Sequence, residues 1–238
     1  MKKLIYCLLI AGSFFTACEV VEKLSQGEVS AAFKEVLDIG VDSAVDVLGV
    51  EDGYYGDEEV KIPLPPEAQK VLENATIKAL VAAVVDMEQV ELGINRSAEA
   101  ASDAATEIIK GAIADLTFTD AASILYGANG NEATEYLKAE AFDQLMEAYG
   151  TPINKQLDQE ILAGQSTNDL YRAFAGVYNA YPFSSGTIDA ETLGAYVTEK
   201  ALDGMFIKME EREREVRANP SEFGSSLISR VLGGGIGL

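Results

Sequence analysis

The sequence contains no histidine and only two cysteines among its 238 residues. Without histidine the chain has no Ser-His-Asp triad, no Cys-His pair and no histidine-ligated metal site. It also lacks a phosphate-binding glycine loop, because the glycines at 233–235 follow no predicted strand and precede no predicted helix. These absences exclude several classes of hydrolase, metalloenzyme and nucleotide-binding protein. We therefore predict no catalytic residue, no metal ligand and no cofactor.

Basic residues are scarce as well. Lysine and arginine number 18 against 39 aspartate and glutamate residues, which gives a net charge of −21. Such a chain is repelled by phosphate backbones and by anionic lipid surfaces, so nucleic acid is not expected as a partner. A cationic partner is permitted by this charge, although solubility alone is a sufficient reason for an acidic surface.

Acidic residues cluster at 51–59, EDGYYGDEE. Clustered carboxylates can bind calcium through their oxygens, but the segment lacks the ligand spacing and closing glutamate of an EF-hand. A solvated turn is the favoured interpretation. Catalysis by paired carboxylates would require two of them to face each other across a cleft, which spacing along the chain does not reveal.

The first 17 residues have the pattern of a signal peptide, with Lys2 and Lys3 before an apolar run that is too short to span a bilayer. Residues 15–18, FTAC, resemble a lipobox, so we predict that Cys18 is lipidated. The alternative is plain secretion with Cys18 as an ordinary residue. Cys7 would leave with the leader, so no disulfide is expected, and losing both lysines changes the net charge from −21 to −23.

A lipidated Cys18 would anchor the protein durably, since each buried methylene contributes about 0.8 kcal/mol. Glu19 follows the cysteine instead of aspartate. By analogy with enterobacterial sorting, this favours the outer membrane of a Gram-negative bacterium, with the domain facing the periplasm. We expect residues 18–27 to be a tether, 28–232 a single helical domain and 233–238 a flexible glycine-rich tail.

The most informative stretch is 95–142, which predicts three consecutive helices with small side chains. In the first helix one narrow face consists of alanines with a few larger apolar residues: Ile94, Ala98, Ala101, Ala105, Ile108, Ala112 and Leu116. Alanines at such spacing allow a neighbouring helix to approach closely. Thr119 is placed to cap the second helix, which would end near Gly127, and Asn131 to cap the third.

A candidate polar site lies in the first of these helices and consists of Asn95, Arg96, Glu99 and Asp103. Arg96 and Glu99 could form a buried pair or an anion clamp. Helical periodicity places Arg96, Glu99 and Asp103 opposite the alanine face, which favours a solvated surface instead.

The remaining pattern predicts an all-α, single-domain bundle of about eight to ten helices. Residues 60–66, VKIPLPP, must form an extended strap, because prolines remove donors and fix φ. In the first half of the chain, helices are predicted at 28–38 and 41–48 with a break at Gly40, and at 67–92 with a central buried part at 77–85 and an end or bend at Gly93. In the second half, a helix is predicted at 153–162 after a turn at Gly150 and Pro152, and another is capped by Asn168. The last long helix is predicted at 190–218, capped by Asp189 and with a solvated end from Glu210, and a short helix is predicted within 221–232.

The helix after Asn168 carries an aromatic stripe at spacings of three, four and three: Tyr171, Phe174, Tyr178 and Tyr181. The stripe could form the wall of a pocket for an apolar ligand. Core packing is the alternative, and it is the commoner role of aromatic residues at helical spacing.

Several segments together resemble a bacterial family known as domain of unknown function 4197. They are VKIPLP at 60–65, NRSAEAA at 95–101, TDAASILYG at 119–127, ATEY at 133–136, YVT and KALDG at 196–204, and VRANP at 216–220. The resemblance covers nearly the whole chain after the leader. It implies a secreted or lipid-anchored helical protein of Gram-negative bacteria, and it carries no functional residue with it.

Three functions remain open at this point. The favoured hypothesis is a non-enzymatic binding or structural module of the cell envelope, with the membrane as one partner and an envelope protein as another. A carrier or sensor of a small apolar molecule, using the aromatic stripe, is the alternative. An enzyme that uses carboxylate chemistry is third.

Overall fold

The computed structural model describes residues 24–119, 123–124, 126–162, 164–182, 184 and 186–233. Within these residues the chain forms eight α-helices and two short 3₁₀ helices. The helices are α1 (Gln26–Leu48), α2 (Pro66–Leu72), α3 (Ala75–Ala82), α4 (Met87–Asp115), α6 (Glu132–Leu157), α7 (Thr167–Asn179), η1 (Ala190–Thr192), α8 (Leu193–Ala218), η2 (Pro220–Phe223) and α9 (Ser226–Gly233). The predicted all-α class is confirmed.

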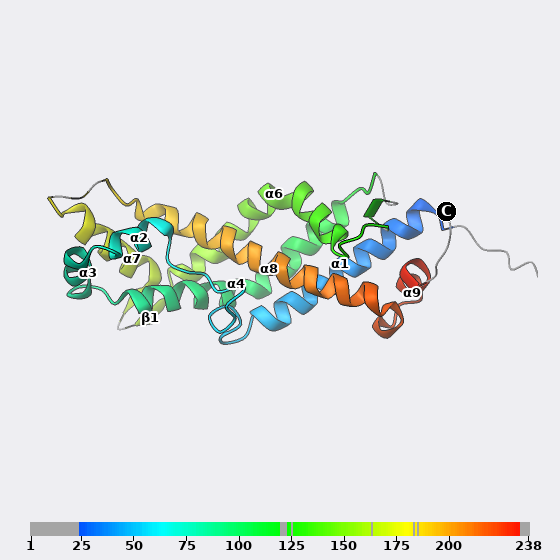
Figure 1. The fold of residues 1–238 in the computed structure, drawn as a ribbon, viewed down its shortest axis with the longest axis horizontal. Coiled ribbons are helices and arrows are strands. Elements are labelled where there is room, and N and C mark those ends of the chain that lie inside the picture. The colour runs from blue at the N-terminus through cyan, green and yellow to red at the C-terminus, as the bar shows by residue number, and fades with distance from the viewer. Residues whose placement is uncertain are drawn as a thin grey trace, which may run out of the picture.

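Four long helices form the body of the protein. Helix α8 packs against α1 and α6, and α4 packs against the same two helices, so that each long helix has two main neighbours. Figure 1 shows the resulting elongated bundle, in which α1 begins at the end that holds α9 while α3 and α7 lie at the opposite end. We call this opposite end the distal end. Helix α4 alone, at 29 residues, is about 43 Å long.

The alanine face of α4 is buried as predicted. Ala98, Ala101, Ala105 and Ala112 are each at most 5% exposed. Helices α1 and α6 both pack against α4, and small side chains let such neighbours approach closely. The buried surface of α4 is wider than the predicted stripe, because Ile109 and Ile113 are also buried.

Three predicted helix breaks are wrong. Gly40 lies inside α1, and Gly150 and Pro152 lie inside α6. Gly40 is buried against α8, where an added Cβ would be in ordinary contact with the Cβ of Met209 at 3.5 Å. In α6 the residues Tyr149, Ile153 and Leu157 are all buried. Their spacing of four keeps one face against the core, and that burial maintains the helix across the proline.

The long helix predicted over 67–92 is also wrong, because the chain forms α2, α3 and the start of α4 there. Asn74 caps α3 by accepting hydrogen bonds from the amides of Thr76 and Ile77, at 3.0 and 3.2 Å. Asp86 caps α4 by accepting from the amide of Glu88, at 3.0 Å. Both are preferred N-cap residue types, and their local bonds outweighed the helical pattern around them. Gly93 lies inside α4, so the end that was predicted for the helix at this glycine is wrong as well.

The second half of the chain follows the prediction more closely, with differences at the ends of helices. A short antiparallel pair, β1 (Glu160–Leu162) with β2 (Gln165–Ser166), replaces the end of the helix predicted at 153–162. Ser166, and not Asn168, caps α7, in a reciprocal capping box with Asp169. Asp189 caps η1, which leads directly into α8, as predicted for the start of that helix.

The end of α8 is not the solvated segment that its charged sequence predicted. Met209, Glu213 and Val216 are each at most 1% exposed. The Glu213 carboxylate accepts hydrogen bonds from the amides of Ala133 and Thr134, at 3.0 and 2.7 Å, in the first turn of α6. It therefore caps a helix that is remote in the sequence, which explains why a charged side chain is buried here.

Several predictions lie outside the described residues. They concern the leader and Cys18, most of the helix predicted between Thr119 and Gly127, and the tail after Gly233. Among the helices that the structure describes, none combines the length and the apolar character needed to cross a bilayer.

Candidate functional site

Asn95 holds the extended strap against α4. It is completely buried. Its Oδ1 accepts a hydrogen bond from the Ile62 amide, and its Nδ2 donates to the Ile62 carbonyl, both at 2.8 Å. Nδ2 also donates to the carbonyl of Glu91 at 2.8 Å. One amide side chain thus replaces the two backbone partners that a neighbouring strand would supply.

Glu99, one turn further along α4, holds the acidic loop in the same way. Its Oε1 accepts from the amides of Tyr54 and Tyr55, at 3.1 and 3.2 Å. Its Oε2 accepts from Arg96 at 2.6 Å, and Arg96 also donates to Asp52 at 2.7 Å. We refer to Asn95, Arg96 and Glu99 as the α4 clamp.

The α4 clamp corrects the prediction of a solvated face. Glu99 is only 5% exposed, whereas Asp103 is exposed and takes no part in the clamp. The loop and strap at 51–64 cover the face that helical periodicity assigned to solvent, and their backbone groups need polar partners there. Of the four residues in the candidate polar site, Asn95, Arg96 and Glu99 contact this segment and Asp103 does not. The sequence did not reveal the segment that covers them. Because the clamp atoms bond to the strap and the acidic loop, these residues organise the fold.

Tyr54 extends the clamped loop across α8. Its hydroxyl donates to the Ala201 carbonyl at 2.8 Å. A Cβ built on Gly204 would lie 2.7 Å from Cε1 of the Tyr54 ring. The glycine of the KALDG segment is therefore needed because the ring packs directly on the α8 backbone.

The aromatic stripe packs in the core. Tyr171, Phe174 and Tyr178 are at most 6% exposed, and the rings of Tyr171 and Phe174 are 5.5 Å apart. Tyr181 packs at the edge of the same core. The two cavities described below are lined by other residues. The arrangement thus agrees with the core-packing alternative.

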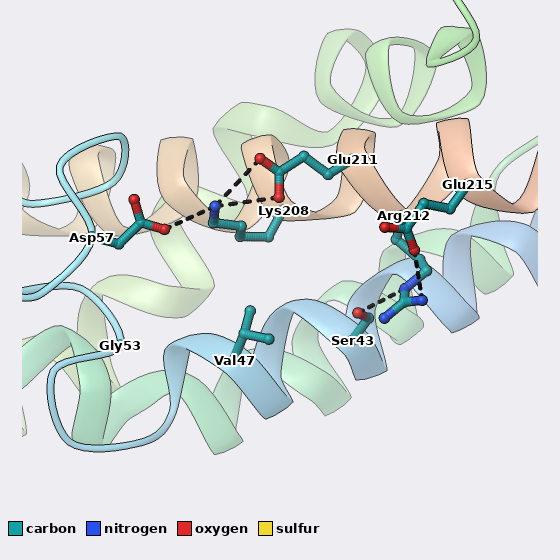
Figure 2. Close-up of a pocket in the computed structure, with 8 residues that line it drawn as sticks. All are labelled: Ser43, Val47, Gly53, Asp57, Lys208, Glu211, Arg212 and Glu215. Carbon is teal, nitrogen blue, oxygen red and sulfur yellow. Dashed lines mark hydrogen bonds and ion pairs between the residues drawn. The ribbon is translucent and has the colours of Figure 1, made fainter.

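A charged groove of about 280 Å³ lies between α1 and α8 under the acidic loop, and Figure 2 shows its lining. The Lys208 amine contacts Asp57 Oδ2 at 2.9 Å and Glu211 Oε2 at 3.2 Å. Arg212 donates through Nε to Ser43 Oγ at 2.8 Å and through Nη1 to Glu215 at 2.7 Å. Every charged side chain that lines the groove has a partner of opposite charge.

These ion pairs attach the acidic loop at 51–59 to the long helices. The hydrogen bond from Lys208 lowers the pKa of Asp57 below its ordinary value. Asp52 pairs with Arg96, so the loop carboxylates meet cations of α4 and α8. In the part of the chain that the structure describes, no three acidic or cysteine side chains are grouped closely enough to hold a metal ion.

A larger cavity of about 480 Å³, here called the distal cavity, lies at the distal end between the strap, α3 and the start of α4. This volume is typical of small-molecule sites, which span about 300–1,000 Å³. Its lining is mostly apolar: Tyr55, Leu64, Leu72, Val81, Ala82, Val85 and Met87, with Lys78, Asp86, Glu88 and Glu91 as the charged members. Lys61 of the strap pairs with Glu91 at 3.0 Å and lies over the Tyr55 ring at 4.4 Å.

Helix α3 and the turn after it also expose apolar side chains, beside the exposed Thr76 and Lys78. Ile77, Val81 and Val85 are buried, but Leu80 is 44% and Val84 62% exposed. The central buried helix predicted at 77–85 is therefore wrong, because this segment lies at the distal end with one side open to solvent. We call Leu80, Val84 and the exposed alanines of α3 the distal face. The apolar run and the flanking caps Asn74 and Asp86 were the sequence signals that could have identified a short, exposed apolar helix.

The distal cavity and the distal face offer apolar contact surface with charged residues at the rim. Asp86 is engaged as a helix cap and Glu91 in an ion pair.

No curated protein and no solved structure matches the chain. A family match extends over residues 23–233, which is almost the whole described chain. The protein belongs to the family described as "Protein of unknown function (DUF4197)".

Proposed function

We propose that this protein is a non-enzymatic binding module of the cell envelope, which is anchored by lipid at Cys18 and binds its partner through the distal face. One observation carries the proposal: Leu80 of α3 and Val84, which follows α3, are exposed beside the 480 Å³ distal cavity. Exposed apolar surface next to a cavity is uncommon in a soluble domain and typically marks an interaction site.

The placement of the two ends supports this function. The predicted lipid on Cys18 precedes α1, and α1 begins at the end of the bundle opposite to α3 (Figure 1). A bundle of helices this long is on the order of 40 Å in extent. A protein anchored through Cys18 would therefore present the distal face away from the membrane surface.

A neutral fluorescent probe, 1-N-phenylnaphthylamine, tests the distal cavity. The probe should bind saturably to the purified Cys18→Ser protein. Ala82 lines the cavity and Ala79 of the same helix does not, so Ala82→Phe should weaken binding about tenfold by filling space while Ala79→Phe leaves it unchanged. Absence of saturable binding, or equal effects of the two variants, would remove the distal cavity as a binding site.

The alternative is a carrier of a small apolar molecule, which the volume of the distal cavity favours. Organic extraction of protein purified from envelopes distinguishes the two. A carrier should release one defined apolar compound in near-equimolar amount, whereas a module that binds another protein should release none.

The anchor has its own test. Cys18→Ser should abolish metabolic labelling with fatty acid and move the protein from the membrane fraction to the soluble fraction. Unlabelled protein that stays on the membrane would show that Cys18 is not the anchor.

A further inference from the structure

The geometry points to a basic amphipathic helix of another protein as the partner of the distal face. This inference rests on the proposed function and adds the chemical class of the partner. Three features support it: the arrangement of apolar side chains on the distal face, the negative charge around that face, and the repulsion of acidic partners by this charge.

The apolar surface has the form of a helix-docking site. Leu80 and Val84 are four residues apart, so they project on the same side of the segment. Most of the neighbouring exposed positions are small, Ala75, Ala79, Ala82 and Ala83, and the others are Thr76 and Lys78. Small residues let a second helix approach, and the adjacent distal cavity can accept one large apolar side chain as an anchor. Helices that bind in this way use apolar residues at i, i+3, i+4 and i+7.

The charge around the distal face determines which sign of net charge a partner should carry. Between residues 66 and 91 there are five acidic residues, Glu67, Glu73, Asp86, Glu88 and Glu91, and two basic residues, Lys70 and Lys78. Lys61 of the strap, which pairs with Glu91, also lies here, so the local net charge is −2, in a chain whose total is −21. Such a field accelerates encounter with a cationic partner and disfavours an acidic one.

The same field argues against two other occupants. A second copy of this chain would bring an equally acidic distal face into contact with the first, and like charges across an interface are costly. A bilayer rich in anionic lipid would be repelled for the same reason. A helix with one apolar face and flanking lysines or arginines satisfies both the apolar and the electrostatic requirements.

Two synthetic helical peptides with the same leucine face test the inference. One carries lysines and the other glutamates on its polar face, and fluorescence anisotropy measures their binding to the Cys18→Ser protein. The lysine peptide should bind at least about tenfold more tightly at low salt, and the difference should shrink as salt is added.

Matched variants separate a local site from general attraction to an acidic protein. Leu80→Gln should weaken binding of the lysine peptide about tenfold, whereas Val50→Gln, at a similarly exposed position outside the distal face, should not. Glu88→Lys should weaken it by about three- to tenfold. Glu107→Lys makes the same change of net charge at an exposed position near the other end of α4 and should have little effect.

Each outcome decides the question. Equal binding of the two peptides, or equal effects within either matched pair, would overturn the inference. Self-association of the unmodified protein in ultracentrifugation that Leu80→Gln abolishes would identify a second copy as the occupant. If the neutral probe binds the distal cavity but neither peptide binds, the proposed function stands and the partner class is wrong.

Discussion

The strongest prediction concerns Asn95, whose side chain replaces a neighbouring strand for the strap. Asn95→Ala removes the acceptor for the Ile62 amide and the donor to the Ile62 carbonyl. A buried unsatisfied donor costs about 1–3 kcal/mol and the second lost bond about 0.5–1.5 kcal/mol. We therefore expect Asn95→Ala to lower the free energy of unfolding by about 2–4 kcal/mol.

Asn95→Asp makes the prediction sharper because its effect depends on pH. A neutral carboxyl can reproduce the amide, with one oxygen accepting from the Ile62 amide and the protonated oxygen donating to the Ile62 carbonyl. An ionised carboxylate would instead face the Ile62 and Glu91 carbonyls, which lie 2.8 Å from Asn95 Nδ2. Folding therefore favours the protonated form, so the pKa of this carboxyl should be raised in the folded state.

The sign of the pH dependence follows from this raised pKa. Below the unfolded pKa of about 3.9 the carboxyl is protonated in both states, and Asn95→Asp should approach the unmodified protein in stability. As pH rises from there through the folded pKa, the variant should lose stability progressively. Asn95→Ala has no group to titrate at this position, so its deficit should stay constant with pH.

Urea unfolding between pH 4 and pH 8 measures both variants. Asp103→Ala serves as the control, because Asp103 lies on the same helix and is exposed, and its cost should stay within about 0.5 kcal/mol. The reasoning about the strap fails if Asn95→Ala costs no more than Asp103→Ala, or if the deficit of Asn95→Asp does not change with pH.

Three further predictions use the same assays. Glu213→Ala should cost about 3–5 kcal/mol, because it leaves the first turn of α6 and the partly buried Arg217 without this carboxylate; a cost under 1 kcal/mol by urea unfolding would contradict the remote cap. Gly204→Ala should lower stability by about 1–3 kcal/mol through a clash with the tyrosine ring, whereas Gly111→Ala, in a helix with open space around the added Cβ, should raise it by about 0.4–1 kcal/mol. Asp57→Asn should be less stable than the unmodified protein at pH 6, because the lowered pKa of Asp57 beside Lys208 stabilises the fold where the carboxylate is ionised. The deficit should shrink as pH falls from the ordinary pKa of 3.8 through the lowered pKa of the folded state; a deficit that does not shrink on acidification would show that the ion pair is not its cause.

Local sequence patterns were sufficient for the fold class and for the main buried face. The alanine spacing of α4 follows from helical geometry alone, and Ala98, Ala101 and Ala105 are buried accordingly. The prolines at 63, 65 and 66 likewise require an extended strap, because proline restricts φ and cannot donate. Both inferences depend only on residues close together in the chain.

Breaks in helices could not be predicted as reliably, because the burial of neighbouring side chains can offset the low helix propensity of glycine and proline. Gly40 and Pro152 both lie inside helices, where packing against α8 or the core offsets their low propensity. Asn74 and Asp86 begin new helices where the apolar pattern predicted one continuous helix. Asn74 and Asp86 could each be recognised in the sequence as a residue type that caps helices. Whether the capping residue or the apolar pattern prevails depends on what each segment packs against.

The roles of the charged residues were decided by contacts between distant segments. Arg96 and Glu99 were identified from the sequence as a candidate ion pair, yet the burial of Glu99 depends on the loop at 51–59. The burial of Glu213 depends in the same way on the first turn of α6. Each of those segments has unpaired backbone amides that need an acceptor. In the same way, the sequence alone indicates that 77–85 is apolar on almost all sides. Only the packing of the long helices places this segment at the distal end and leaves Leu80 and Val84 exposed.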